Sequence, residues 1–329
     1  MVRNNMKRER RMKLNSKCLF LIVLALCLVA VQKLQAQDVV PVRPKPDEHS
    51  VPVYSSREMK ELMRFIPLEE VKMPSVFRTT KENRLSDPAG SLFPFWEKLT
   101  LLDRPVRIVH IGDSHIRGHV LAYEVRLLLE SDFGAKAVEA IPVSYQTSGL
   151  ARETGSDGIV YHMFGINGAT CASFSTPDNL KQVADLQPDL IIFSFGTNEA
   201  HGRAYSKAEH TAAMRQMVDE LKMACPQTAF LLTTPPGAYV RSRQGRVINP
   251  RTPAVVDNEL QFARERGMAV WDLYNIVGGK SRACLNWTAA KMFQRDKIHF
   301  THDGYKFQGR LLHEAIIKAY NDYVASRLD

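Results

Sequence analysis

From residue 105 onward, short runs of apolar residues alternate with longer segments in which apolar positions recur every three or four residues. The first run, Val106–Ile111, is rich in β-branched residues and is followed by a glycine turn and an amphipathic segment. This order predicts a strand, a tight turn and a helix. The pattern recurs and predicts strands at 159–166, 190–195, 229–233 and 268–273 and helices at 177–185, 206–223, 253–266 and 305–326. Such alternation is typical of an α/β fold, here a three-layer sandwich whose central five-stranded sheet is mostly parallel.

The N-terminal residues follow a different pattern, which is typical of an export signal. Basic residues precede the unbroken apolar run Cys18–Val31, and the polar residues 32–37 follow it. We expect a peptidase to cut after Ala36 or Gln37. The apolar run has 14 residues, whereas a helix needs about 20 to span a bilayer. The sequence therefore predicts a cleavable signal over residues 1–37, no stable membrane anchor after cleavage, and a periplasmic or secreted protein.

Two further segments precede the alternating pattern. Residues 38–54 are rich in proline and valine, which predicts an extended linker. Residues 55–104 contain two segments with helical patterning, at 56–65 and 95–102. We expect them to form a helical extension that packs on the main domain, which occupies residues 105–329.

Composition and charge narrow the class of protein. The 329 residues are 45% hydrophobic and 24% charged, as in ordinary globular proteins. The formal net charge of +9 comes largely from residues 1–37, which hold eight Lys and Arg and one acidic residue, whereas the rest of the chain has 36 basic and 34 acidic residues. A near-neutral chain lacks the excess of positive charge that binds nucleic acid, so we expect no nucleic-acid partner.

Three cysteines remain outside the predicted signal: Cys171, Cys225 and Cys284. Their odd number allows at most one internal disulfide, and their spacing does not match a Cys-x-x-Cys zinc site. We therefore predict that the fold does not depend on disulfides, and the sequence implies no metal or cofactor.

Polar or flexible residues follow the first three predicted strands directly. Ser114 lies in the turn between the first strand and its helix, a position that suits a nucleophile whose own amide helps to hold an oxyanion. Gly168 follows the second strand and would let its backbone N–H approach a substrate closely. Asn198 follows the third strand and brings a side-chain amide to the same rim. Taken singly, each residue is also common in ordinary turns.

A fourth segment, before the last helix, holds Asp296 and His299. An acid three residues before a histidine in a short loop can reach the imidazole and fix its tautomer. Together, the four segments supply a nucleophile, oxyanion donors, a base and an orienting acid. This is the full set of groups for acyl transfer at an ester carbonyl.

These four segments resemble the four blocks of the GDSL or SGNH hydrolase superfamily, which carry Ser, Gly, Asn and a paired Asp and His. The resemblance covers roughly residues 105–327 and implies the SGNH hydrolase fold, which is flavodoxin-like. It implies that Ser114 is the nucleophile, that His299 is the general base and that Asp296 orients it. The Ser114 amide, Gly168 and Asn198 would form the oxyanion hole.

Several neighbouring residues resemble those of exported peptidoglycan O-acetylesterases in particular. They are His115 after the serine, Glu199-Ala200 after Gly-Thr-Asn, Trp271-Asp272 before Gly278-Gly279, and Asp296–Thr301 before Gly304-Tyr305. The resemblance implies a secreted serine esterase that removes O-acetyl groups from a polysaccharide through an acyl-enzyme intermediate. The expected partner is an O-acetylated polysaccharide, either peptidoglycan or another glycan.

Three alternatives stay open at this point, and the first is a lipase or short-chain acylhydrolase of the same fold. Three loops expected around the site, 146–158, 199–205 and 241–251, are polar or glycine-containing and would offer a long acyl chain little apolar surface. A non-catalytic glycan-binding protein is the second alternative. The presence of every catalytic residue type counts against it.

The third alternative is a metal-dependent phosphoesterase, which needs ligands clustered around two metal ions. The chain has no Gly-His-x-His motif, which counts against this class. The ligands would have to come from Asp113, Ser114, His115, Asn198, Glu199, His201, His299 and His302.

Overall fold

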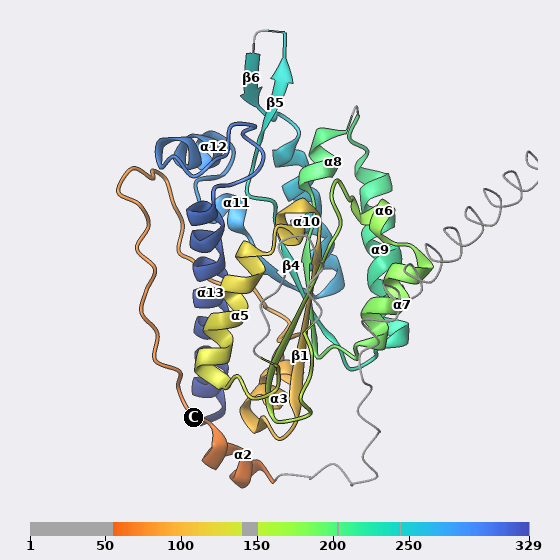
Figure 1. Ribbon diagram of the computed structural model, residues 1–329, viewed down its shortest axis with the longest axis vertical. Coiled ribbons are helices and arrows are strands. Elements are labelled where there is room, and N and C mark those ends of the chain that lie inside the picture. The colour runs from red at the N-terminus through yellow and green to blue at the C-terminus, as the bar shows by residue number, and fades with distance from the viewer. Residues whose placement is uncertain (1–54, 140–150, 203, 244, 329) are drawn as a thin grey trace, which may run out of the picture. The chain divides into compact units, whose positions relative to one another are not determined.

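The computed structural model describes residues 55–139 and 151–328, apart from Arg203 and Gln244 (Figure 1). The predicted signal and linker, residues 1–54, lie outside the described residues, and so does the first part of the polar loop expected at 146–158. Within the described ranges, no helix has the length and apolar character needed to cross a membrane.

A five-stranded parallel sheet forms the centre of the domain, as the sequence predicts. Its strand order is β2-β1-β3-β4-β7, so the order reverses between β1 and β3. In sheets of this kind, ligands bind in the crevice outside the carboxyl ends of the strands at such a switch point. The strands are β1 (Pro105–Gly112), β2 (Gly158–Gly165), β3 (Leu190–Ser194), β4 (Ala229–Thr233) and β7 (Ala269–Trp271).

Helices cover both faces of the sheet because side chains alternate along each strand. In β1, Ile108 belongs to one buried cluster and Val109 to the other. The first cluster packs mainly against α5 (Val120–Phe133), α12 (Gly279–Ala289) and α13 (His302–Leu328). The second packs mainly against α6 (Cys171–Phe174), α7 (Pro177–Asp185), α9 (Lys207–Ala224) and α10 (Thr252–Arg266). Figure 1 shows α5 and α13 on one side of the sheet and α7 and α9 on the other.

The predicted strands and long helices are confirmed to within a few residues. The last helix begins at His302 rather than at 305, and α12 and the short helices α6, α8 (Thr197–His201) and α11 (Leu273–Ile276) were not predicted. In the N-terminal extension, α2 (Ser56–Leu62) and α3 (Phe93–Leu101) form at the two predicted positions. Phe95, Trp96 and Leu99 of α3 are buried in the first cluster.

The polar segment 241–251 was expected to be a loop, and this expectation is wrong for most of it. Residues 239–248 form an antiparallel hairpin of β5 (Tyr239–Ser242) and β6 (Gly245–Ile248). Its strands are short and expose polar side chains, so the alternation that marks a half-buried strand is absent. Figure 1 shows the hairpin projecting beyond α12 and α8.

A line of buried polar side chains crosses the sheet near the strand ends that carry the site. The His110 ring in β1 lies 2.8 Å from the Tyr161 hydroxyl and 2.7 Å from Ser194 Oγ. Ser194 Oγ in turn lies 2.7 Å from Thr233 Oγ1 in β4. Burial lowers the pKa of His110 to about 3, so the ring is neutral. These hydrogen bonds fix four neighbouring strands relative to one another.

Candidate active site

Ser114 lies where β1 ends and the short helix α4 (Ser114–Arg117) begins. Asp113 caps this helix, because its carboxyl oxygen accepts a hydrogen bond from the His115 amide at 2.8 Å. The turn packs closely on β2: a Cβ added to Gly165 would lie 2.2 Å from the Arg117 nitrogen. The first backbone N–H groups of a helix have no partner within the helix, so the Ser114 amide is available to an oxyanion.

The structure brings Ser114, His299 and Asp296 into one hydrogen-bonded series. Ser114 Oγ lies 2.9 Å from His299 Nε2. On the other side of the ring, His299 Nδ1 lies 2.6 Å from Asp296 Oδ2. The histidine and aspartate side chains are half-buried, which leaves the serine end of the series open to a substrate. Nothing but the fold places Ser114 beside His299, because 185 positions separate them in the sequence.

The loop that carries Asp296 and His299 is tightly folded. Asp296 Oδ1 accepts hydrogen bonds from the Ile298 and His299 amides at 2.9 and 3.0 Å. Lys297 has a positive φ of 59°, a conformation that costs a non-glycine residue roughly 1–2 kcal/mol. The Phe293 and Phe300 rings stack at 4.6 Å and close the base of the loop.

The same contacts set the charge of the orienting acid. Burial opposes ionisation of Asp296, but the hydrogen bonds from the His299 ring and the two amides outweigh it and lower the pKa of this carboxyl. Asp296 therefore remains a carboxylate at neutral pH. It accepts the Nδ1 proton of His299 and leaves Nε2 free to accept a proton from Ser114.

Asn198 and Gly168 lie at the two neighbouring strand ends, as predicted. Asn198 Nδ2 donates to Asp113 Oδ2 at 3.0 Å and to the Ala169 carbonyl at 2.9 Å. The amide thus joins the serine turn to the loop that carries Gly168. Gly168 is exposed with a φ of 73°, and a Cβ built on it would meet no atom within 4 Å. Both amide hydrogens of Asn198 already form hydrogen bonds within the protein. To bind an oxyanion, one of these hydrogens must therefore be shared between the oxyanion and its present acceptor.

Asp113 and His115 keep charge away from the serine. Burial raises the pKa of the Asp113 carboxyl to about 8, which favours its neutral form beneath the site. Burial lowers the pKa of His115 to about 3, and the nearby His299 adds to this effect. The His115 ring lies 5.4 Å from that of His299, and its Nδ1 lies 2.8 Å from the Tyr305 hydroxyl. This pairing with Tyr305 was not predicted from the sequence.

Among the residues that the structure describes, one group gathers metal-ligating atoms: Cys171, Glu199 and His210. Glu199 also has a structural role, because its carboxylate accepts hydrogen bonds from the Cys171 amide at 2.7 Å and the Gly196 amide at 2.9 Å. His210 Nε2 lies 3.8 Å from Cys171 Sγ, although 39 positions separate the two residues in the sequence. This group contains no member of the Ser114 series.

Three other histidines considered as metal ligands, His201, His299 and His302, lie outside this group. His201 Nδ1 lies 2.7 Å from the Thr197 carbonyl within α8. The His302 side chain is 64% exposed at the start of α13, and His299 is the histidine that contacts Ser114.

The three cysteines outside the predicted signal are free and buried.

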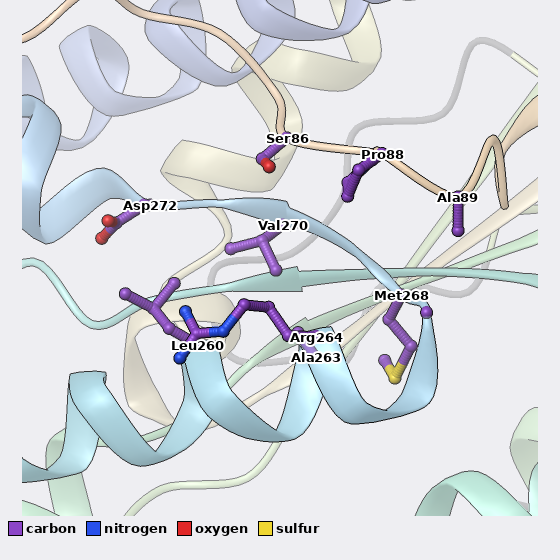
Figure 2. A pocket seen from close by; sticks show the side chains of 10 residues that line it. Ser86, Pro88, Ala89, Leu260, Ala263, Arg264, Met268, Val270 and Asp272 are labelled. Atoms are coloured by element: carbon purple, nitrogen blue, oxygen red, sulfur yellow. The ribbon is translucent and has the colours of Figure 1, made fainter.

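A hollow of about 460 Å³ lies away from these residues, between the segment 86–89 and the end of α10. Figure 2 shows Leu260 and Arg264 beneath it and Pro88 above it. It is lined by none of the predicted site residues.

A family model for GDSL-like lipases and acylhydrolases matches residues 111–307, which span Ser114 to the start of the last helix. No curated protein matches the chain.

Solved structures resemble this chain at low sequence identity, and one of them shares its fold. A peptidoglycan O-acetylesterase superposes with a TM-score of 0.63 at 18% identity, over 72% of this chain and 99% of its own. A lipase/acylhydrolase from Enterococcus faecalis has a TM-score of 0.44 at 22% identity, over 65% and 96% of the two chains. An acetylxylan esterase from Geobacillus stearothermophilus has a TM-score of 0.44 at 17% identity, over 64% and 94%.

Proposed function

This chain belongs to the GDSL-like lipase/acylhydrolase family, and we propose that it is an exported serine esterase that removes O-acetyl groups from a polysaccharide. The observation that carries the proposal is the series of hydrogen bonds from Ser114 through His299 to Asp296 at the switch point of the sheet. A nucleophile in contact with a base, and a base oriented by an acid, are the groups that acyl transfer to water requires.

Each group has one task in the proposed reaction. Ser114 Oγ attacks the acetyl carbonyl carbon while His299 Nε2 takes the hydroxyl proton. The tetrahedral intermediate collapses when His299 returns this proton to the sugar oxygen, which leaves as a free hydroxyl. Water then attacks the acetyl-serine with His299 again as base, and acetate is released. Asp296 holds the ring in one tautomer and stabilises its positive charge during both steps.

The developing oxyanion would be held by the Ser114 amide, the Gly168 amide and Asn198. The first lies at a helix N-terminus, and the second lies in an exposed loop with no neighbouring atom over its Cα. Preorganised donors of this kind stabilise the transition state more than the ground state. The neutral form of Asp113 would place no opposing charge next to them.

Replacing Asn198 by alanine is expected to lower kcat by about 10²–10³, because one oxyanion donor is lost. The change also leaves Asp113 and the Ala169 carbonyl without the donor that now joins them, so we expect the melting temperature to fall. Steady-state kinetics and thermal melts of the same preparations separate the two effects. A variant that melts earlier but retains full kcat would show that Asn198 only joins the loops.

Two predictions from the sequence and one comparison support acetyl esters on an extracytoplasmic glycan as the substrate. The predicted signal would place the protein where such glycans occur, the polar segments around the site offer little surface to a long acyl chain, and a peptidoglycan O-acetylesterase shares the fold over most of this chain. Each CH₂ group of an acyl chain that stays exposed to water lacks the binding free energy of about 0.8 kcal/mol that its burial would contribute. We therefore place peptidoglycan first among the candidate substrates and other glycans second.

This proposal predicts a steep dependence on acyl length. Hydrolysis of p-nitrophenyl esters is expected to fall from acetyl to octanoyl, and acetate is expected to be released from O-acetylated peptidoglycan or xylan. An enzymatic acetate assay and a chromogenic assay measure the two quantities. A preference for octanoyl or longer esters would favour the lipase alternative, and failure to release acetate from any acetylated glycan would contradict the proposed substrate class.

A serine mechanism predicts that metal removal has no effect. Prolonged treatment with EDTA is expected to leave the esterase rate unchanged, whereas a phosphonylating reagent is expected to abolish it by attaching covalently to Ser114. Intact mass spectrometry and peptide mapping would locate the adduct. Activity that disappears with EDTA and returns with manganese or zinc would instead support the phosphoesterase class.

A further inference from the structure

The β5–β6 hairpin carries a group of exposed arginines, Arg241, Arg243 and Arg246, which we call the basic arm. The sequence from 239 to 251 contains no acidic residue. Among the described residues, no acidic side chain forms an ion pair with these three arginines. The arm therefore presents positive charge to solvent that no acidic side chain among the described residues neutralises through an ion pair.

The register of the hairpin places two of these arginines on the face that packs against the core at the base of the hairpin. Tyr239 pairs with Ile248 and Arg241 pairs with Arg246, so all four side chains share one face. Tyr239 and Ile248 pack against the core cluster at the base of the hairpin. The Tyr239 amide donates to the Lys297 carbonyl at 2.9 Å.

A direct contact joins the arm to the catalytic series. The Arg246 guanidinium donates a hydrogen bond to the backbone carbonyl of Asp296. Two further cations, Arg295 and Lys297, flank Asp296 in the same loop, and Arg295 is exposed. Positive charge thus extends from the edge of the catalytic loop to the tip of the hairpin.

This arrangement costs stability in the free protein, since like charges directly opposite each other destabilise an antiparallel pair. Arg241 and Arg246 are such a pair. An anionic ligand lying along this face would remove the repulsion. Arginine suits a carboxylate in particular, because its planar guanidinium can donate two parallel hydrogen bonds to one carboxylate.

We propose that the basic arm binds carboxylate groups of an acidic polysaccharide while one of its O-acetyl groups lies at Ser114. The inference rests on the proposed esterase function and narrows its substrate class. At ~3.4 Å per residue, Arg243 stands roughly 14 Å from Tyr239 at the base of the hairpin. The arm therefore contacts the polymer at sugars beyond the one that bears the scissile acetyl group. Tyr239 is the only aromatic residue of the hairpin, and its ring packs on Phe293. The hairpin therefore offers no free ring on which nucleic-acid bases could stack.

The test compares two forms of one polymer. Chemically acetylated polygalacturonate carries free carboxylates, and its methyl-esterified form has the same backbone without the charges. We expect kcat/KM for acetate release to be at least about tenfold higher on the charged form, through KM, and the preference to vanish in about 1 M NaCl, where the Debye length is about 3 Å.

Variants of the arm provide the second measurement. The double variant Arg241→Gln with Arg243→Gln spares Arg246, which contacts Asp296, and is expected to bring the two polymers to nearly equal KM values. Arg215→Gln with Lys222→Gln removes the same charge from exposed positions on α9 and serves as the matched control. Equal kcat/KM on both polymers in the unmodified protein, or a preference that survives in the arm variant, would overturn the proposal.

Failure of the esterase function itself would look different. The rate on p-nitrophenyl acetate, which is uncharged and too small to reach the arm, reports on Ser114, His299 and Asp296 alone. No hydrolysis of this ester and no acetate from either polymer would defeat the proposed function. Hydrolysis of both polymers without any effect of charge would defeat only the role of the arm.

Discussion

Replacing Ser114 by alanine is expected to remove nearly all esterase activity, with a loss in kcat on the order of 10⁶ as in serine hydrolases whose nucleophile is deleted. The Ser114 hydroxyl is the group in contact with His299 Nε2 at 2.9 Å. Alanine cannot form the acyl-enzyme, and His299 then has no proton to remove. The backbone donors remain in place, so the residual rate would be that of the oxyanion hole and binding alone.

Acetate release and p-nitrophenyl acetate hydrolysis measure this loss, and thermal melts establish that the variant is folded. Ser281→Ala is a suitable control, since Ser281 is an exposed residue of α12 outside the site. Retention of more than a few per cent of activity by Ser114→Ala, with Ser281→Ala unaffected, would refute the assignment of the nucleophile.

The second large effect is expected for Asp296→Asn, with a loss in kcat on the order of 10⁴. Asp296 accepts the Nδ1 proton of His299 at 2.6 Å. An asparagine that donates its NH₂ to Nδ1 would favour the tautomer with the proton on Nε2, and this nitrogen could no longer accept the proton of Ser114. The loss is expected in kcat rather than in KM, because Asp296 does not touch the substrate.

Asp303→Asn is the matched control, since Asp303 lies seven residues further along the chain and its side chain is 95% exposed. Kinetics of both variants on the same ester separate loss of the orienting acid from loss of one negative charge. A loss smaller than about tenfold in Asp296→Asn would mean that the carboxylate only holds the loop together through the Ile298 and His299 amides, since removal of an orienting acid costs far more.

The sequence predicted the sheet and the long helices because burial leaves a local pattern. A parallel strand that is covered on both faces reads as a continuous apolar run, and Leu190–Ser194 and Ala229–Thr233 are buried almost throughout. The helix Pro177–Asp185 has its apolar residues at helical spacing and was placed correctly. Exposed elements leave no such pattern, and for this reason the arginine hairpin at 239–248 was taken for a loop.

Candidate site residues could be chosen from the sequence because each directly follows a strand or precedes the last helix. In a parallel α/β sheet the carboxyl ends of the strands lie at one edge, so Ser114, Gly168 and Asn198 had to lie on the same side of the molecule. The residue types then indicated acyl transfer. The order of the strands along the chain and the chemistry of their ends can thus be predicted from local sequence patterns alone.

Which of these side chains are in contact depends on the folded arrangement of the whole domain. The contact of Ser114 with His299, the engagement of both amide hydrogens of Asn198, and the pairing of His115 with Tyr305 join residues 29 to 190 positions apart. The position of the basic arm over the Asp296 loop is decided in the same way. Such contacts depend on strand order and on the packing of loops at the sheet edge. Neither feature leaves a periodic pattern in the local sequence. The reason is that packing of the core, rather than the residues adjacent along the chain, brings the partners together.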